Sequence, residues 1–295
     1  MTGVALGIDV GGSSTRALAV DAGGAVVGRG TAGGANPNTN GPAHAAAQVL
    51  SAACTALGER PVAACVIGMA GVSTMKDPAV AAEFQPVFEL LRPRLVSDAE
   101  VAFASGTAAP HGTVLISGTG SIAMRIVHRA RDATSGGFGW LLGDEGSAYW
   151  IGREAVRATL RMLQSGDVLG PLARSVVSFL PAEDDQLALF GKLIRAVNRE
   201  APIRLARFAP LVCEVDDPVA AGIVERAAQS LSGQAIAVHD GGPVVLAGAV
   251  MRTIVGTRVR ELLAGREVAE TRDGVLGAAW LAAVDAFGED AIPPS

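Results

Sequence analysis

One local pattern occurs twice in this chain, and it restricts the fold more than any other feature of the sequence. A short apolar strand, a turn of glycine and hydroxyl residues, and a second short strand are predicted over residues 4–20 and again over residues 113–127. A unit repeated in this way is typical of two domains built on one plan. We therefore predict an α/β protein with two similar halves that face each other across a cleft.

The remaining segments add strands and helices to both halves. Further strands are expected at residues 25–27, 62–67, 95–97 and 244–247, and helices at residues 44–57, 79–91, 144–164, 187–197, 203–208, 218–238 and 274–287. Glycine-rich loops are expected at residues 33–38 and 136–140. Pro110 and Gly112 interrupt regular structure between the halves, so we predict domains at residues 1–108 and 109–295.

The two glycine-rich turns have the composition of an anion site. Gly11–Ser14 and Ser117–Ser121 would each direct several backbone N–H groups to one point, and glycine lets phosphate oxygens approach closely. Neither Lys76 nor Lys192 follows the pattern G-x-x-x-x-G-K-S/T, which excludes a P-loop. Backbone dipoles, hydroxyl groups and Mg²⁺ would therefore neutralise a nucleotide, and Asp9 could hold the hydrated Mg²⁺.

Each turn also has a simpler interpretation. Gly11–Ser14 could be an ordinary hairpin. Gly118–Ala123 fits the loose dinucleotide fingerprint G-x-G-x-x-A, which requires a helix directly after the turn. The parallel between the two turns favours a strand there.

Three polar residues are candidates for the chemistry, each with an alternative. Asp98 follows a predicted strand, where it could be a general base or merely the N-cap of the next helix. Asp144 is either a helix cap or a polar ligand in a cleft, and Glu145 is interpreted as a solvated neighbour. Asn36, beside Pro37, could be only a turn residue.

The composition excludes several classes of protein. Hydrophobic residues make up 49% of the 295 residues and charged residues only 18%, unlike disordered chains. The net charge of −5 and the lack of any Lys/Arg run argue against nucleic acid or an anionic membrane as main partner. No apolar stretch is long enough to cross a bilayer, and Met1–Gly3 lacks the basic segment of a signal peptide. We expect a cytoplasmic protein.

The cysteines and histidines show no ligand pattern. Cys54, Cys65 and Cys213 are scattered and form no C-x-x-C pair, which is typical of reduced thiols. The four histidines have no metal-binding spacing, so we expect no metal held by protein ligands alone. The G-x-S-x-G elbow of serine hydrolases is also absent.

Three segments together carry a resemblance to a known family: Gly7–Ser13, Ser117–Ser121 and Gly143–Trp150. They resemble N-acetylglucosamine kinases of the BadF/BadG/BcrA/BcrD branch of the actin-like ATPase superfamily. The similarity extends to Gly248–Val250 and Gly274–Ala282, so it covers essentially the whole chain. It implies two RNase H-like domains that close over ATP, Mg²⁺ and a sugar.

The resemblance also implies roles for individual residues. Asp98 matches the catalytic aspartate, which binds the sugar as well. Further sugar ligands are implied at Asn36, Thr119, Gly120, Gly136, Gly137 and Asp144. ATP ligands are implied at Gly11, Gly12, Ser13, Thr119, Gly248 and Ala249. The chain departs from the animal enzymes at Ile122, where they have asparagine.

The sequence therefore predicts an ATP-dependent kinase for the 6-hydroxyl of N-acetylglucosamine. A glucosamine kinase on the same scaffold remains open, because the sequence does not separate an amine from an acetamide. An ATPase activator of a dehydratase or reductase would need cysteines placed for a [4Fe–4S] cluster. A sugar-sensing repressor would need a DNA-binding module, for which we expect no room before Val4 or after Phe287. The expected partners are an amino sugar and ATP, with a homodimer as a further possibility.

Overall fold

The structure is a computed structural model that describes residues 3–183, 185–271 and 273–294. It contains two five-stranded sheets. The strands of the first are β1 (Val4–Val10), β2 (Ser14–Val20), β3 (Val26–Gly33), β4 (Val62–Met69) and β5 (Arg94–Ser97). Those of the second are β6 (Gly112–Ser117), β7 (Ser121–Val127), β8 (Ala130–Gly136), β9 (Val244–Ala247) and β10 (Val268–Glu270).

The two sheets have the same plan. Their strand orders are β3-β2-β1-β4-β5 and β10-β9-β6-β7-β8, so the second, read from its other end, repeats the first. In each sheet the first three strands are consecutive neighbours, and the fourth lies on the free side of the first. The predicted internal repeat is therefore confirmed.

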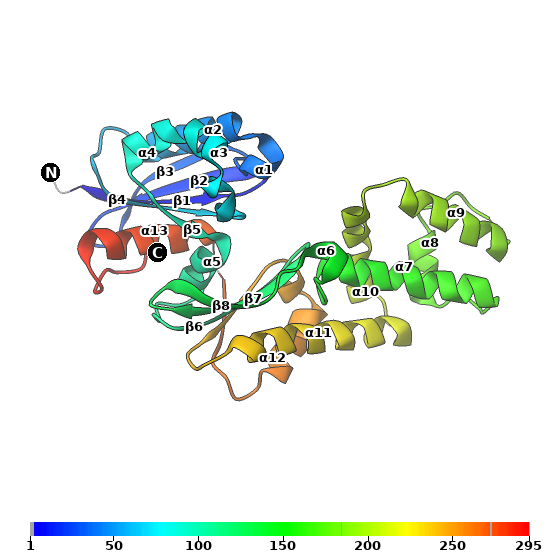
Figure 1. Cartoon of the computed structure of the whole chain (residues 1–295). Helices are drawn as coiled ribbons and strands as arrows, with labels where there is room; N and C mark the ends of the chain where they lie inside the picture. The colour runs from blue at the N-terminus through cyan, green and yellow to red at the C-terminus, as the bar shows by residue number, and fades with distance from the viewer. Residues whose placement is uncertain (1–2, 184, 272, 295) are drawn as a thin grey trace. The chain divides into compact units, whose positions relative to one another are not determined.

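Helices surround both sheets (Figure 1). In the first half they are α1 (Pro37–Asn40), α2 (Pro42–Leu57), η1 (Val72–Lys76), α3 (Pro78–Glu83), α4 (Gln85–Leu91) and α5 (Asp98–Gly106). The later ones are α6 (Gly139–Leu142), α7 (Ala148–Ser165), α8 (Pro171–Val177), α9 (Gln186–Asn198), η2 (Pro202–Phe208), α10 (Ala209–Glu214), α11 (Pro218–Val238), η3 (Val250–Arg252), α12 (Ile254–Leu262) and α13 (Gly274–Phe287). Among the described helices, none combines the length and the hydropathy that crossing a bilayer requires.

The chain forms two compact units, and each is assembled from separate segments of the sequence. Unit 1 contains the residues up to Val114, residues 126–132 and the residues from Ala269 onward. Unit 2 contains Leu115–Arg125 and Ala133–Val268. This differs from the division expected after residue 108, chiefly because α13 packs on the first sheet and so returns the end of the chain to unit 1.

The first sheet is buried on both faces. Leu6 and Ile8 of β1 pack with α2 and α4 on one side, whereas Ala5 packs with α13 on the other; Figure 1 shows these helices on opposite faces. At Gly7 the backbone of α13 comes so close that an added Cβ would lie 2.0 Å from the Ala279 nitrogen. Only glycine fits there.

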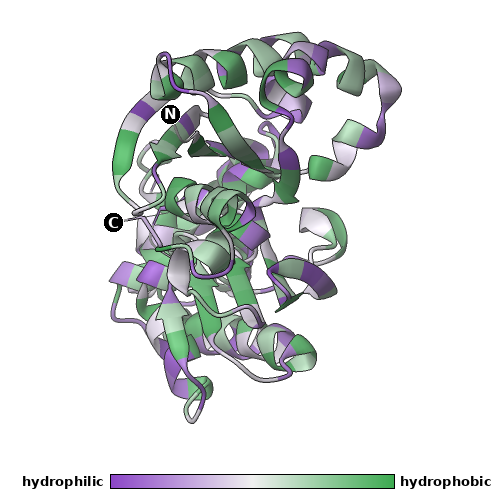
Figure 2. Cartoon of the chain, turned by 90° about the vertical axis from the view of Figure 1, so that its left-hand side faces the viewer, coloured by the Kyte–Doolittle hydropathy of each residue, from purple (hydrophilic) through white to green (hydrophobic). Residues whose placement is uncertain are grey.

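The core of unit 2 is mainly helical. Residues such as Ile151 of α7, Leu193 of α9 and Leu231 of α11 are fully buried together. Figure 2 shows the hydrophobic stretches of the helices and strands in green. Burial of one apolar face per helix explains why the helices predicted over residues 187–197 and 218–238 are found in the structure.

Several elements differ from the sequence-based prediction. The helix expected over residues 79–91 is divided into α3 and α4, because Pro86 lacks the N–H needed to continue a helix. The segment 203–208 is a 3₁₀ helix rather than an α-helix. Strand β8 was not predicted, because it is a largely exposed edge strand without an apolar run.

Candidate functional site

Two carboxylates lie at one edge of the first sheet. Strands β1, β4 and β5 run parallel, so their carboxyl ends lie together, as in open α/β sheets that bind ligands there. Asp9 lies near the end of β1, and Asp98 directly follows β5. Both carboxylates therefore belong to this edge of the first sheet.

Asp98 is not the cap of its helix. Ser97 is the N-cap of α5: its hydroxyl accepts from the Glu100 N–H, and the Glu100 carboxylate accepts from the Ser97 N–H at 2.7 Å. This is a complete capping box, so the capping alternative for Asp98 is wrong. Asp98 is the first helical residue, and its Oδ1 accepts from the Ala99 N–H at 3.1 Å.

The environment of Asp98 suits a proton acceptor. Its side chain is accessible to solvent, but surrounding protein atoms partly desolvate the carboxylate and raise its pKa above the ordinary 3.8. Two backbone hydrogen bonds lower the pKa, and the charges of Asp9 and Glu100 raise it further. A carboxylate of raised pKa is a stronger base than an ordinary one.

The loop that carries Asn36 packs against the first glycine-rich turn. The Ala35 N–H donates to the Gly11 carbonyl at 3.0 Å, and a Cβ on Gly34 would lie 2.0 Å from the Gly12 oxygen. Asn36 caps α1, its Oδ1 accepting from the Asn38 N–H. The structure thus brings Asn36 beside the glycine-rich turn Gly11–Ser14. Asn36 also has the simpler local role, because it caps α1.

The predicted residues of unit 2 converge on the second turn. The Gly118 carbonyl accepts from Ala148 N–H, and the Ser121 carbonyl accepts from Gly137 N–H. Gly248 approaches the Ser117 carbonyl so closely that a Cβ would lie 2.2 Å from its oxygen. A strand, β7, follows the turn, so the dinucleotide-fingerprint alternative is excluded.

Asp144 is held beside this turn in an unusual backbone conformation. Its φ is 61°, which is uncommon for a residue other than glycine. The carboxylate is buried, accepts from the Ser121 N–H at 3.2 Å and lies against Gly120. Burial raises its pKa. Ser147, not Asp144, caps α7, so the capping alternative is wrong here too, whereas Glu145 is exposed as expected.

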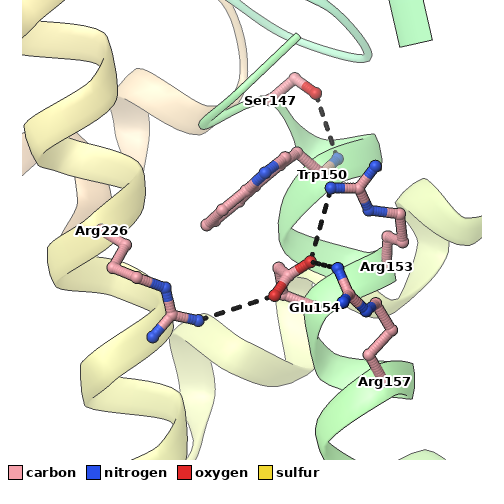
Figure 3. A network of polar contacts seen from close by, with 6 residues as sticks. All are labelled: Ser147, Trp150, Arg153, Glu154, Arg157 and Arg226. Atoms are coloured by element: carbon pink, nitrogen blue, oxygen red, sulfur yellow. Dashed lines mark hydrogen bonds and ion pairs between the residues drawn. The ribbon is translucent and has the colours of Figure 1, made fainter. Parts of the chain in front are cut away.

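A charged network fixes the first turns of α7, the helix that follows Asp144 (Figure 3). Glu154, whose side chain is only 12% exposed, pairs with three arginines. Its oxygens lie 3.5 Å from Arg153, 2.9 Å from Arg157 and 3.8 Å from Arg226 of α11. The Arg226 guanidinium also lies over the Trp150 ring, at 5.9 Å from its centroid.

We expect Glu154→Gln to destabilise the protein by ~1–3 kcal/mol, because it leaves three guanidinium groups without their shared carboxylate. Denaturant unfolding would measure this. Glu261→Gln is the matched control, since Glu261 is 57% exposed and its partner Arg258 keeps Glu225. Equal effects of the two substitutions would contradict a special role for Glu154.

A cavity of about 340 Å³ is lined in part by Ala249, one of the ATP ligands that the resemblance implies. It is mostly apolar and belongs wholly to unit 2. Its walls come from α7, η2, α10, η3 and α12 and include Ile151, Ala209, Pro210, Cys213, Ala249 and Thr253. A concave apolar site with a few polar groups is the usual form of a site for a small molecule.

The residues around Asp9 fit a hydrated magnesium ion. Among the described residues, no group of three or more His, Cys, Asp or Glu side chains could cage a metal. Mg²⁺ does not need such a cage, because it usually keeps several waters and binds one or two carboxylates together with substrate phosphates. Asp9 supplies a carboxylate of the right kind beside the glycine-rich turn.

Arg16 was not predicted from the sequence as a candidate site residue. Its Nη2 lies 2.6 Å from Asp9 Oδ2, and its Nη1 lies 2.8 Å from Asp273 Oδ2. Arg16 of β2 stands directly opposite Asp9 in the antiparallel register. Opposite charges at paired positions of a predicted hairpin are a signal that could have identified it.

A model of the BadF/BadG/BcrA/BcrD ATPase family matches residues 6–282 of the chain. The chain belongs to this family. The match includes both glycine-rich turns and Asp98, so the geometry described above is that of a family member. The resemblance seen in the sequence is confirmed.

Two curated relatives of this BadF/BadG/BcrA/BcrD-family chain are sugar kinases by name. It is 30% identical over 167 residues to the N-acetylmuramic acid/N-acetylglucosamine kinase of Clostridium acetobutylicum, a match covering 56% of this chain and 54% of that protein. It is 32% identical over 181 residues to the N-acetyl-D-glucosamine kinase of Dictyostelium discoideum, covering 56% of each. The chain thus spans about half the length of the curated relatives it matches.

A solved structure is similar over nearly the full length. It is a protein of Chromobacterium violaceum that was proposed to be an N-acetylglucosamine kinase, 25% identical, with a TM-score of 0.73. The similarity covers 95% of this chain and 99% of that one. Together with the two sheets of equal plan, it confirms the predicted α/β fold of an actin-like ATPase.

Proposed function

We propose that this chain is a kinase that transfers the γ-phosphoryl group of ATP to the 6-hydroxyl of an amino sugar, with N-acetylglucosamine as the leading substrate. The observation that carries the proposal is Asp98, an accessible carboxylate at the end of a parallel strand that no helix cap requires. Family membership supports ATP as donor. The names of the two curated relatives support an amino sugar as acceptor.

In the proposed reaction, Asp98 orients the sugar hydroxyl and accepts its proton. The hydroxyl oxygen forms a bond to the γ-phosphorus while the bond between that phosphorus and the ADP oxygen breaks. The proton moves to Asp98, and the products are the sugar 6-phosphate and ADP. Raised basicity of this carboxylate favours the transfer.

The other predicted residues would bind the two substrates. Asp144 and the backbone at Gly120 and Gly137 present polar groups for sugar hydroxyls. The Gly11 N–H closes the first turn by donating to the Ser14 carbonyl, and the N–H groups of Gly12 and Ser13 suit phosphate oxygens. The apolar cavity beside Ala249 would hold the adenine. When bound, Mg²⁺ would neutralise phosphate charge, with Asp9 as its protein partner through water.

The names of the two curated relatives support N-acetylglucosamine as the leading substrate. Asn36 Oδ1 accepts from the Asn38 N–H, and its amide nitrogen can still donate to a sugar hydroxyl or to an acetamide carbonyl. Glucosamine is the second candidate substrate, on the same scaffold.

We expect ADP release that requires both an amino sugar and Mg²⁺. A coupled assay over N-acetylglucosamine, glucosamine, N-acetylmannosamine, muramic acid derivatives and glucose would rank the substrates, and NMR of the product would locate the phosphate. Full activity in EDTA, or ADP release independent of every sugar, would overturn the proposal.

The activator alternative lacks suitably placed cysteines. Cys54 is exposed on α2, Cys65 is buried in β4 and Cys213 lies in α10. They lie on separate elements and none belongs to a glycine-rich loop, as the sequence predicted. Iron analysis of the purified protein would test this directly, since an activator would carry a cluster.

A further inference from the structure

Arg16 connects two carboxylates that would otherwise repel each other. One is Asp9, on the neighbouring strand, and the other is Asp273, the N-cap of α13. The guanidinium lies 2.6 Å from the first and 2.7 Å from the second, with one nitrogen directed at each. The group of three has a net charge of −1, so one positive charge is shared by two anions.

Asp9 is closely enclosed on the side of α13. A Cβ on Gly274 would lie 3.0–3.3 Å from the atoms of its carboxylate, so the first turn of the helix leaves no space there. Arg16 binds Oδ2, and in the described part of the chain nothing donates to Oδ1. The Arg16 side chain is 41% exposed. Its guanidinium covers part of the Asp9 carboxylate surface that α13 leaves accessible.

An ion pair with only a structural role differs from the Arg16 contacts. Arg94 of β5 also joins the first sheet to α13, through Asp285 at 2.8 Å, and it is exposed to the same 41%. That pair is one arginine with one carboxylate, away from the glycine-rich turn. Arg16 differs because it is shared, and because one of its partners is the carboxylate that suits a magnesium ion.

We propose that Arg16 is an internal counter-ion that competes with a divalent cation for Asp9. In the structure the guanidinium holds Asp9 Oδ2, so a metal-bound water would have to use Oδ1 beside a positive charge that repels the cation. Asp273 keeps the guanidinium beside the turn when it leaves Asp9. Metal ions alone would then bind weakly, and binding would depend on the phosphates that arrive with the metal. This inference rests on the proposed function, which makes Asp9 the partner of Mg²⁺.

The test is titration of the nucleotide-free protein with Mn²⁺ as the probe, followed by EPR. We expect Arg16→Met to bind Mn²⁺ at least about tenfold more tightly than the wild type, because removing a positive charge a few ångströms from a divalent cation has at least this effect. Arg16→Gln, which can still hydrogen-bond to Asp9, should show the same gain and serves if the methionine variant folds poorly. Adding Asp9→Asn should abolish the gain.

Arg94→Met is the matched control and should leave Mn²⁺ binding unchanged. Lower thermal stability of the Arg16 variants with unchanged Mn²⁺ affinity would show a structural tie only and would overturn the inference, as would weaker Mn²⁺ binding. Sugar-dependent ADP release by the wild-type protein tests the proposed function separately. If the wild type is active in that assay but the Arg16 variants gain no Mn²⁺ affinity, the counter-ion inference is wrong and the proposed function stands.

Discussion

Asp98→Asn should fold like the wild-type protein and lose about 10²–10⁴-fold in kcat, the usual contribution of a general base. Asparagine keeps the shape of aspartate but cannot accept the hydroxyl proton. Because Ser97 and Glu100 cap α5, the substitution leaves the helix start intact. The number to compare is kcat at saturating sugar, since Asp98 should also bind the sugar and KM can rise.

The same variant should show a pH signature. The pKa of Asp98 is raised in the folded protein, so the folded state binds the proton more readily than the unfolded chain between pH 3.8 and the raised value. Stability from this group is therefore lost as pH rises through that window. At neutral pH, Asp98→Asn should melt at the same temperature as the wild type or slightly above it, and any gain should vanish near pH 3.8.

The catalytic rate of the wild type should depend on pH in the opposite sense to stability: it should increase as pH rises through the pKa of Asp98. Activity of the wild type should fall as acid protonates Asp98, with an apparent pKa above 3.8 that the variant lacks. If the asparagine variant turns over sugar within a few-fold of the wild type, Asp98 is not the base. The proposed mechanism would then fail at its central residue.

Gly7→Ala should strongly destabilise unit 1. The new Cβ would lie 2.0 Å from the Ala279 nitrogen and 2.3 Å from its Cα, both backbone atoms of α13 that cannot rotate away. Overpacking against backbone forces the helix off the sheet, and we expect a loss of about 3 kcal/mol or more. Urea or thermal unfolding would measure it.

Gly233→Ala is the control for the glycine substitution itself. Gly233 is an exposed residue of α11, and no atom lies within 4 Å of its added Cβ. Alanine in a helix interior should raise stability by ~0.5–1 kcal/mol. A Gly7→Ala protein as stable as this control would mean that α13 does not approach β1 so closely.

Prediction from sequence succeeded where a pattern has one physical cause. β1 and β2 are apolar runs around a glycine-rich turn, and such a run can be little else than a buried hairpin. β8 was missed because an exposed edge strand needs no apolar residues, so its mostly polar and small side chains carry no periodic signal. Its position depends on hydrogen bonds to a neighbouring strand, which the local sequence does not encode.

The candidate site shows the same distinction. Asp98 could be located because it follows a strand, but its role was left open although the signal was present: Ser97 and Glu100 have the spacing of a capping box. The conformation of Asp144 and its contact with Gly120 depend on residues 24 positions apart folding together. The bond from Arg16 to Asp273 joins residues 257 positions apart, which no local pattern reveals.

The return of α13 to the first sheet has a consequence for how the chain acquires its structure. The helix covers one face of β1, yet all residues of unit 2 are synthesised after β1 and before α13. Until α13 emerges, Ala5, Leu18 and Val66 expose an apolar sheet face. The helical core of unit 2 can form first, and unit 1 matures only through interactions of very long sequence separation, which form slowly. Nascent chains of this protein should therefore depend on chaperones until α13 is available to pack on the first sheet.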